Sequence, residues 1–248
     1  MSPVRQKDVA NDPILFRVEA QPIDRKNGRP FGPEMDLWQD GMVAIGTDEA
    51  GRGPLAGPVV AAAVCFPPSV NLPGIGDSKV LTEAKREKLF DKIQKAALGF
   101  SIIAIEPERI DETNILAASA EAMGKAVREV AQQVDSDWPT LLVDGRIPSL
   151  GLGRQLNIIK GDARSFTIGA ASILAKVHRD RLMVKMAQLY PEYGFERHKG
   201  YPTEEHRSTL LHVGRCPIHR CSFTIAGSDG GRIAVGDLPK RKADGNIQ

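Results

Sequence analysis

Hydrophobic residues in the middle of the chain gather into short runs that predict buried β-strands. Five such runs lie at 42–48, 58–66, 100–106, 140–144 and 156–160. They are rich in Val, Ile, Leu and Ala, and most are bounded by Gly, Pro or charged residues. Runs of this kind are typical of strands in the interior of a sheet.

Helical periodicity appears between and after these strands. Longer patterns predict helices at 82–98, 114–134 and 167–188, with a shorter one at 203–212. The order is strands first, then alternating helices and strands, then helices, and no internal repeat is visible. The sequence therefore predicts an α/β fold with a central sheet and a helical C-terminal appendage.

The two ends of the chain lack this periodicity. Residues 1–40 contain many Pro, Asp and Gly, as in DRKNGRPFGPEMD, and residues 227–248 have a similar composition. We therefore predict one catalytic domain over 41–226 that includes the helical C-terminal region. A flexible N-terminal extension and a flexible C-terminal tail are expected to flank it.

The apolar runs and the cysteines of the sequence indicate where in the cell the protein is expected. The longest apolar run, 59–66, is followed by two prolines and is too short to cross a bilayer, and the first residues are not apolar enough for a secretory signal. Three cysteines are an odd and sparse set for a disulfide framework. We therefore expect a cytoplasmic protein with no membrane association.

Charge is distributed unevenly. The formal net charge of +2 does not by itself indicate a nucleic-acid-binding protein. However, residues 160–185 contain six Lys or Arg against two Asp, and residues 194–221 contain five against three acids, with four of the five His. This distribution suits a surface that contacts phosphates, although a solvated helix face would have the same composition.

Three of the predicted strands end at an acid beside a glycine. AIGTDEAG gives Asp48 and Glu49, LLVDG gives Asp144, and IIKGD gives Asp162. Side chains alternate along a strand, so Asp48 shares a face with Gly46, and Glu49 can join that face only if the strand ends there. Each acid alone is equally well explained as a turn or capping residue, but the shared context favours a common role.

Four carboxylates at neighbouring strand ends would repel one another unless a cation neutralises them. Mg²⁺ takes oxygen ligands and is commonly held by a few carboxylates, waters and substrate phosphates. Two such ions about 4 Å apart form the clamp used for in-line attack of water on a phosphodiester. The sequence thus predicts a divalent-metal site at this edge of the sheet.

Glycines follow the first pair of acids. Gly51 and Gly53 allow a backbone to approach a ligand closely, and Arg52 between them adds a positive charge. The pattern is weak by itself, because GRGPLAG lacks the Gly-Lys-Ser/Thr of a phosphate-binding P-loop and a tight turn between two strands would also use it.

Several stretches together resemble one known family. In order they are GTDEAGRGPLAGPVVAAAV, GDSKVLT, NILAAS, LVDG, IIKGD, GAASILAKVHRDR, YPEYGFERHKGYPTEEH and HRCSF. They are similar to type 2 ribonucleases H (ribonuclease HII) of the bacterial type, over about residues 43–223. The first stretch and HKGYPT are highly specific, whereas LVDG alone is not. Gly169 departs from the family, which often has Ser there.

The resemblance implies an RNase H-like fold with a central mixed sheet flanked by helices. It also implies a monomeric endonuclease that cuts the RNA strand of RNA–DNA hybrids and incises 5′ of ribonucleotides embedded in duplex DNA, with two Mg²⁺ or Mn²⁺ ions. Its catalytic metal ligands correspond to the four acids named above. Gly51, Arg52 and Gly53 would sense the ribose 2′-hydroxyl, and Tyr201 would pack against a sugar, unless it is a buried core tyrosine.

Three further residues are weaker candidates for substrate binding. Lys79 precedes a predicted helix whose N-terminus favours anions. Asn114 begins another helix as its N-cap, with contact to nucleic acid as the role that the resemblance adds. On the later helix, Ala170, Ile173, Leu174, Val177 and Val184 form an apolar stripe. Ser172, Lys176 and Arg179 form a second stripe that would face either phosphates or water.

Other readings predict different chemistry. A different metal-dependent nuclease or resolvase would use the same acids but give GRG and Tyr201 no evident purpose, and a non-catalytic nucleic-acid-binding module would not need the acids. A structural zinc site at His212, Cys216, His219 and Cys221 is a weaker alternative, because the cysteine spacing is not that of paired ligands.

Overall fold

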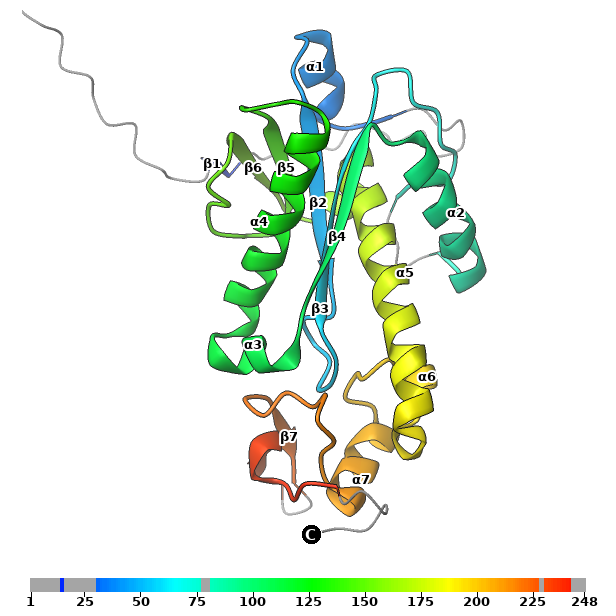
Figure 1. Cartoon of the computed structure of the whole chain (residues 1–248), viewed down its shortest axis with the longest axis vertical. Helices are drawn as coiled ribbons and strands as arrows, with labels where there is room; N and C mark the ends of the chain where they lie inside the picture. The colour runs from blue at the N-terminus through cyan, green and yellow to red at the C-terminus, as the bar shows by residue number, and fades with distance from the viewer. Residues whose placement is uncertain (1–13, 16–29, 77–80, 228–229, 242–248) are drawn as a thin grey trace, which may run out of the picture.

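The computed structural model describes residues 14–15, 30–76, 81–227 and 230–241. Its centre is a mixed six-stranded sheet with the order β1-β6-β5-β2-β3-β4 (Figure 1). The strands are β1 (Ile14–Leu15), β2 (Ala44–Ala50), β3 (Val59–Cys65), β4 (Gly99–Ile105), β5 (Thr140–Asp144) and β6 (Arg154–Ile158). β2 runs antiparallel to β3 and parallel to β5. All five predicted strands are confirmed.

Helices cover the sheet and extend below it. They are α1 (Glu34–Gln39), α2 (Glu83–Ala96), α3 (Pro107–Glu112), α4 (Ile115–Gln133), α5 (Phe166–Leu189), α6 (Phe195–His198) and α7 (Glu204–Val213), with short 3₁₀ turns η2 (Gly161–Ala163), η3 (Pro191–Tyr193) and η4 (Val235–Asp237). The predicted α/β sheet with a C-terminal helical appendage is therefore confirmed. Helix α3 has no counterpart among the predicted elements, because a single turn and a half carries too little periodicity.

The two faces of the sheet bury different positions of the same strands. Ile45, Leu141 and Val143 pack in a core with α4, whereas Ala44 and Leu142 pack against Ile168 of α5. Each fully buried Leu or Ile contributes about 1.5–3 kcal/mol. Because the pattern repeats every second residue, the even-numbered positions of β2 and β5 face α5.

Helix α5 is the longest element and connects the sheet to the C-terminal region. Ser165 caps its start by accepting a hydrogen bond from the amide of Ile168. Four of the five residues of its predicted apolar stripe are buried, but Val184 is 39% exposed, because the helix has by then passed the edge of the sheet core. Arg179, predicted to face phosphates or water, is buried.

Structured segments extend beyond the expected domain boundaries at 41 and 226. Helix α1 lies before the first boundary, and its Glu34 is buried, accepting hydrogen bonds from the amide of Thr167 and the hydroxyl of Ser165. β1 also precedes it and pairs with β6. After 226, β8 (Arg232–Ala234) pairs with β7 (Thr224–Ala226). Contacts with distant parts of the chain order these segments, and local periodicity does not reveal such contacts.

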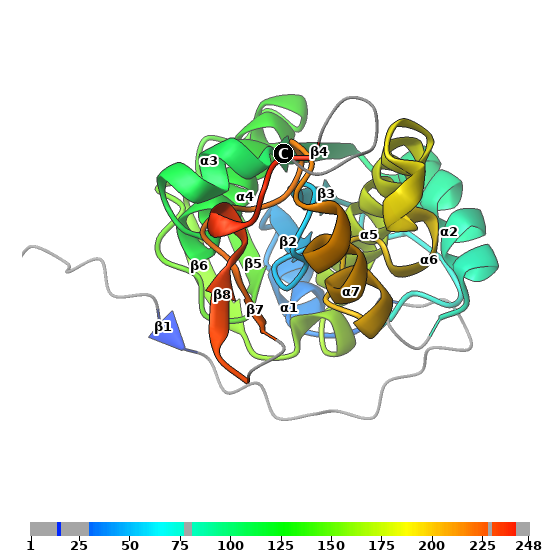
Figure 2. The ribbon, with the colours of Figure 1, turned by 90° about the horizontal axis from the view of Figure 1, so that it is seen from below.

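The C-terminal region packs onto the loop between β2 and β3. Leu55 and Ala56 of that loop share a small core with Met183, Phe195 and Leu210. The amide of Leu55 also donates to the carbonyl of Gly200. Figures 1 and 2 show α7 and β7 gathered around this tip of the β2–β3 hairpin. Within the described residues no helix is both long and apolar enough to span a membrane.

Candidate active site

Acidic side chains lie at the ends of three adjacent strands. In the β2–β5 register Thr47 is opposite Val143, which places Asp48 and Asp144 next to each other. Both occupy even positions and so face α5. Asp162 follows the neighbouring strand β6 and lies in the 3₁₀ turn η2, where it is buried. The sheet thus places Asp48 beside Asp144, and Asp162 follows the next strand of the sheet, β6.

Burial and mutual repulsion perturb these acids. The pKa of Asp48 is raised well above its ordinary value by desolvation and then by the negative charges of Asp144 and Glu49. A hydrogen bond from Ser172 of α5 and one from the amide of Glu49, at 2.7 Å, oppose that rise. Asp144 accepts a hydrogen bond from the amide of Gly161 at 2.5 Å. Carboxylates in this state favour a cation or a proton nearby.

Glu49 lies beside this pair under different constraints. The alternation of side chains predicts that both acids share one face only if β2 ends at Asp48. Instead β2 continues to Ala50, with Glu49 paired to Ala61 of β3. Arg52 binds one carboxylate oxygen of Glu49 at 3.3 Å. The other oxygen, Oε2, is buried without a hydrogen-bond partner in the described part of the chain. Burial raises the pKa of Glu49, and the charge of Asp144 raises it further.

These features fit an oxygen-ligated metal site in donor chemistry. The donors are hard carboxylate oxygens, one of them is buried and unpaired, and their charges repel one another. Nevertheless, among the described residues no three His, Cys, Asp or Glu side chains are gathered closely enough to hold a metal ion as they stand. The acids are electrostatic neighbours, and their side chains would have to turn toward a shared ion.

The proposed ribose-sensing loop begins directly after the acids. Gly51 adopts φ +98°, a left-handed conformation that favours glycine. Arg52 is partly exposed. A Cβ on Gly53 would lie 3.7 Å from the ring of Tyr201, so the loop and this tyrosine are in contact range. Tyr201 is 40% exposed, which rules out the buried core tyrosine considered from the sequence.

Helix α5 brings a lysine to the same place. The Nζ of Lys176 lies 5.8 Å from the centre of the Tyr201 ring and 2.7 Å from Asp180 Oδ1. Ser172, one turn earlier, interacts with Asp48. The predicted second stripe of α5 therefore runs beside the acids and Tyr201, except that Arg179 points into the protein.

Three histidines hold the turn that carries Tyr201, a feature that the sequence analysis missed. His206 Nδ1 lies 3.0 Å from the carbonyl oxygen of Tyr201, and His206 Nε2 lies 3.1 Å from His219 Nε2. The amide of Gly200 donates to His198 Nδ1. Burial lowers the pKa of His206 to about 4 and that of His219 to about 3. They are neutral hydrogen-bonding groups, and the only sequence signal was their density.

The pattern of partners assigns a proton to two histidines of this group, His206 and His219. His219 Nδ1 accepts from the amide of Cys216, which leaves its Nε2 to donate to His206 Nε2. His206 Nδ1 then donates to the carbonyl of Tyr201. A proton added to His206 would place two N–H groups face to face, so the arrangement requires the neutral forms.

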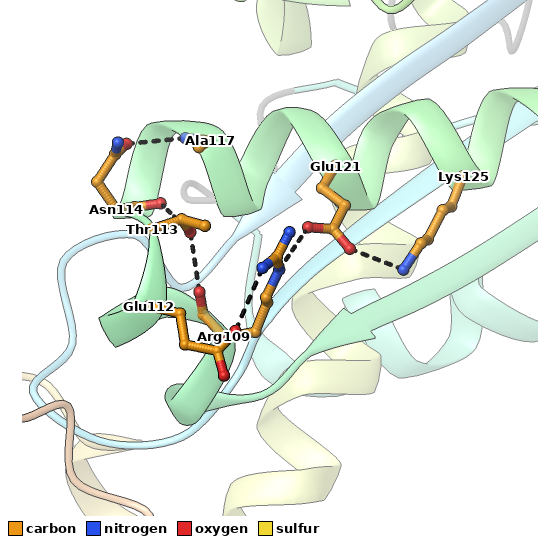
Figure 3. A network of polar contacts seen from close by, with 7 residues as sticks. All are labelled: Arg109, Glu112, Thr113, Asn114, Ala117, Glu121 and Lys125. Carbon is orange, nitrogen blue, oxygen red and sulfur yellow. Dashed lines mark hydrogen bonds and ion pairs between the residues drawn. The ribbon is translucent and has the colours of Figure 1, made fainter.

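The remaining candidates lie elsewhere or outside the described residues. Asn114 caps α4, its side-chain oxygen accepting from the amide of Ala117 at 2.9 Å, which confirms the N-cap (Figure 3). The same corner is braced by Arg109, which binds Glu112 and Glu121. Asn114 is exposed, so the capping role leaves its amide group at the surface. Lys79 lies outside the described residues.

The alternative zinc ligands have other partners. His212 Nδ1 lies 2.7 Å from the carbonyl oxygen of Ser208. Cys216 Sγ lies 3.1 Å from His219 Nδ1, whose other nitrogen faces His206. All three cysteines are free thiols. These contacts account for three of the four residues, and the fourth, Cys221, has its Sγ 3.9 Å from the carbonyl oxygen of His219.

Comparisons with known proteins place both the acids and Tyr201 in one matched segment. The sequence model of a family described as ribonuclease HII matches residues 45–226. A ribonuclease HII of Desulfitobacterium hafniense strain Y51 is 52% identical over 192 residues, 77% of this chain and 72% of that protein. The crystal structure of ribonuclease H2 from Pyrococcus horikoshii OT3 matches with a TM-score of 0.62 and 30% identity, over 73% of this chain and 94% of that one. A ribonuclease HII of Archaeoglobus fulgidus, solved in complex with PCNA, has a TM-score of 0.54 and 25% identity, over 68% and 87% of the two chains.

Proposed function

The chain belongs to the ribonuclease HII family, and on that premise we propose that it hydrolyses the RNA strand of RNA–DNA hybrids and incises duplex DNA 5′ of an embedded ribonucleotide. Membership makes it a metal-dependent ribonuclease H of type 2 with an RNase H-like fold. Membership of the family does not by itself establish incision at single ribonucleotides. That part of the proposal rests on the arrangement of this chain's own residues.

One observation carries the proposal. The loop 51–53 and the partly exposed Tyr201 come from parts of the chain far apart in sequence, yet Gly53 and the Tyr201 ring are in contact range, immediately after Asp48 and Glu49. A backbone loop and an aromatic ring together form two walls suited to one sugar. Only the 2′-hydroxyl distinguishes ribose from deoxyribose at such a place.

We assign the metal-binding role to Asp48, Glu49, Asp144 and Asp162. The unpaired Oε2 of Glu49 and the raised pKa of Asp48 support this assignment, since both describe carboxylate oxygens whose charge the protein leaves incompletely neutralised. Two Mg²⁺ or Mn²⁺ ions, when bound, would supply an activated water and stabilise the leaving 3′-oxygen, giving 3′-hydroxyl and 5′-phosphate ends. No covalent enzyme intermediate is expected.

The other residues would bind and orient the substrate. Lys176, at 5.8 Å from the Tyr201 ring, is placed to contact a phosphate next to the recognised sugar. Arg52 can reach another phosphate from the exposed loop. Asn114 and Lys79 remain candidates for contacts with the backbone of the duplex farther away. Phosphate contacts of this kind position a duplex without reading its sequence.

The test is cleavage of a labelled DNA duplex that contains one ribonucleotide, in Mg²⁺ and in EDTA. All-DNA and all-RNA duplexes are the controls, and a four-way junction tests for a resolvase. A metal-dependent nick 5′ of the ribonucleotide, absent from every control, is the expected result. Cleavage of long hybrids alone would withdraw the single-ribonucleotide role of loop 51–53 and Tyr201. Binding without any cleavage would favour the non-catalytic binding module.

A further inference from the structure

Two arginines are buried behind the loop that follows the acids. Arg179 of α5 is 1% exposed and Arg220, near the end of the C-terminal region, is 0% exposed. In the described part of the chain neither forms an ion pair with a carboxylate within 4.0 Å. Burying a charge without a counter-ion is costly unless hydrogen bonds replace the lost water. The structure must therefore gain something specific from them.

Backbone carbonyls replace that water. Arg220 donates to the carbonyl oxygens of Gly51 at 2.6 Å, Arg52 at 3.2 Å and Gly57 at 2.9 Å. Arg179 donates to those of Ala56 at 3.0 Å, Pro58 at 2.9 Å and Lys199 at 3.0 Å. Between them the two guanidinium groups hold both ends of loop 51–58 and the turn just before Tyr201.

The contacts of Arg220 also fix the direction of two amide groups. In a planar trans peptide the C=O and the following N–H point in opposite directions. With the carbonyls of Gly51 and Arg52 held inward by Arg220, the amides of Arg52 and Gly53 point away from it. Neither amide donates a hydrogen bond within the described part of the chain. The loop thus presents two free donors on the side opposite the buried charge.

Arg179 explains the glycine that begins this loop. A Cβ on Gly51 would lie 2.1 Å from Arg179 Nε, so only glycine permits the close approach. The charges persist at neutral pH: burial lowers the pKa of Arg179 to about 10 and, with the repulsion from Arg179, that of Arg220 to about 9. Two neighbouring positive charges behind the loop strengthen its outward donors toward an anionic or hydroxyl acceptor.

We propose that Arg220, supported by Arg179, is a positioning residue that turns the amides of Arg52 and Gly53 toward the substrate ribose and its phosphate. The inference rests on the proposed incision at single ribonucleotides. Arg220 itself does not touch the substrate. It acts by holding the recognition loop in one conformation before binding, so that the loop need not be ordered afterwards.

The experiment compares R220Q and R220K with the wild-type chain and with R215Q as a matched control. Arg215 donates to the carbonyl of Leu238 in the same C-terminal region but does not contact loop 51–58. Affinity for a duplex with one ribonucleotide and for the same all-DNA duplex is measured without cleavage, in Ca²⁺. The ratio of the two affinities does not depend on the fraction of folded protein. Multiple-turnover cleavage, which gives kcat and KM, and thermal unfolding are measured alongside.

We expect R220Q to lose most of the preference for the ribonucleotide and to lower kcat by about 10- to 100-fold, as misplacement of a recognition group does. R220K retains the charge with fewer donors and should be intermediate, while R215Q keeps the wild-type ratio. If R220Q or R220K destabilises the protein but keeps the wild-type ratio and kcat, the arginine is only structural and the inference is wrong. If the wild-type chain itself shows neither preference nor incision, the proposed function fails instead.

Discussion

The two sides of loop 51–58 bury opposite charges and satisfy them differently. On the sheet side, Asp48 and Glu49 have raised pKa values, and Glu49 keeps an unpaired oxygen. On the C-terminal side, Arg179 and Arg220 have lowered pKa values but six hydrogen bonds to backbone carbonyls. The chain does not pair the arginines with the acids. The arginine side has its hydrogen bonds without a ligand, whereas on the acidic side Arg52 neutralises only one oxygen of Glu49 and Asp48 is left facing other negative charges.

This difference indicates that the two regions have different roles in binding. A region already satisfied by its own backbone can hold a loop rigid in the free protein. A region with repelling carboxylates gains most from a bound cation, since the cation removes repulsion as well as adding ligand bonds. The structure therefore predicts a rigid recognition loop beside a site that metal completes.

On the sheet side, removing one acid should have the largest effect on the cleavage rate. We expect D48N to lower the cleavage rate by more than about 100-fold, beyond the 10- to 100-fold typical of groups behind a metal ligand. Binding of the duplex should survive, because phosphate contacts supply most of the affinity. Single-turnover nicking and fluorescence anisotropy measure the two effects.

Metal-free D48N should also be more stable than the metal-free wild-type chain, because it removes the repulsion with Asp144 and Glu49. Thermal unfolding in EDTA measures this. D144N is the companion variant, with the same expected loss of cleavage. Near-normal activity of D144N would show that the metal site has been assigned to the wrong residues.

The dependence of stability on acidic pH tests the C-terminal side, which contains the buried histidines His206 and His219. His206 and His219 have pKa values of about 4 and about 3 in the folded protein, below the ordinary value of 6.5. Between pH 6.5 and these lower pKa values, the two histidines bind more protons in the unfolded chain than in the folded protein. The stability that the neutral histidines contribute is therefore present above pH 6.5 and is lost as the pH falls. Each histidine adds a slope of up to about 1.4 kcal/mol per pH unit.

Urea unfolding between pH 7 and pH 4.5 measures that slope. H206Q removes one of the two titrating groups, while its amide can still donate to the carbonyl of Tyr201. The variant should be less sensitive to acid than the wild-type chain over the same range. An unchanged pH dependence in H206Q would mean that other groups dominate the acid lability.

Tyr201 lies where the two sides meet, and its loss should have a smaller effect. We expect Y201A to lower kcat/KM on the single-ribonucleotide duplex by about 10-fold, in line with about 1–3 kcal/mol for an aromatic ring stacked on a nucleotide. Y201F is the control and should retain most activity if the ring face is what matters. Equal losses in both variants would assign the role to the hydroxyl group.

Glu34 lies away from the site, so its replacement should have the smallest effect on cleavage. Burial raises its pKa to about 7 from an ordinary value of 4.5. The stabilising contribution of its neutral form is present below pH 4.5 and is lost as pH rises to about 7, which is opposite to the histidines. The stability of E34Q relative to the wild-type chain should therefore rise between pH 5 and pH 7, by up to about 1.4 kcal/mol per pH unit. Parallel stability curves for the two proteins would contradict this.

Much of the site could be predicted from the sequence because its signals are local. Hydrophobic runs predicted the strands, and three of the five were followed by an acid beside a glycine, so Asp48 and Asp144 could be expected on neighbouring strands. The predicted N-cap at Asn114 needs only the residues of one helical turn. The face of α5 that carries Ser172 and Lys176 followed from helical spacing.

The tertiary structure decided what depends on contacts between distant segments. Arg220 and Gly51 are separated by 169 residues, and Glu34 and Thr167 by 133, so no local pattern connects them. A buried arginine that binds carbonyls has the same sequence signature as a solvated one, since its partners are backbone atoms without residue identity. The sequence by itself determined which acids lie at or near the ends of the strands. Only the fold decided which positive charges lie behind the recognition loop, because burial belongs to the packed chain as a whole.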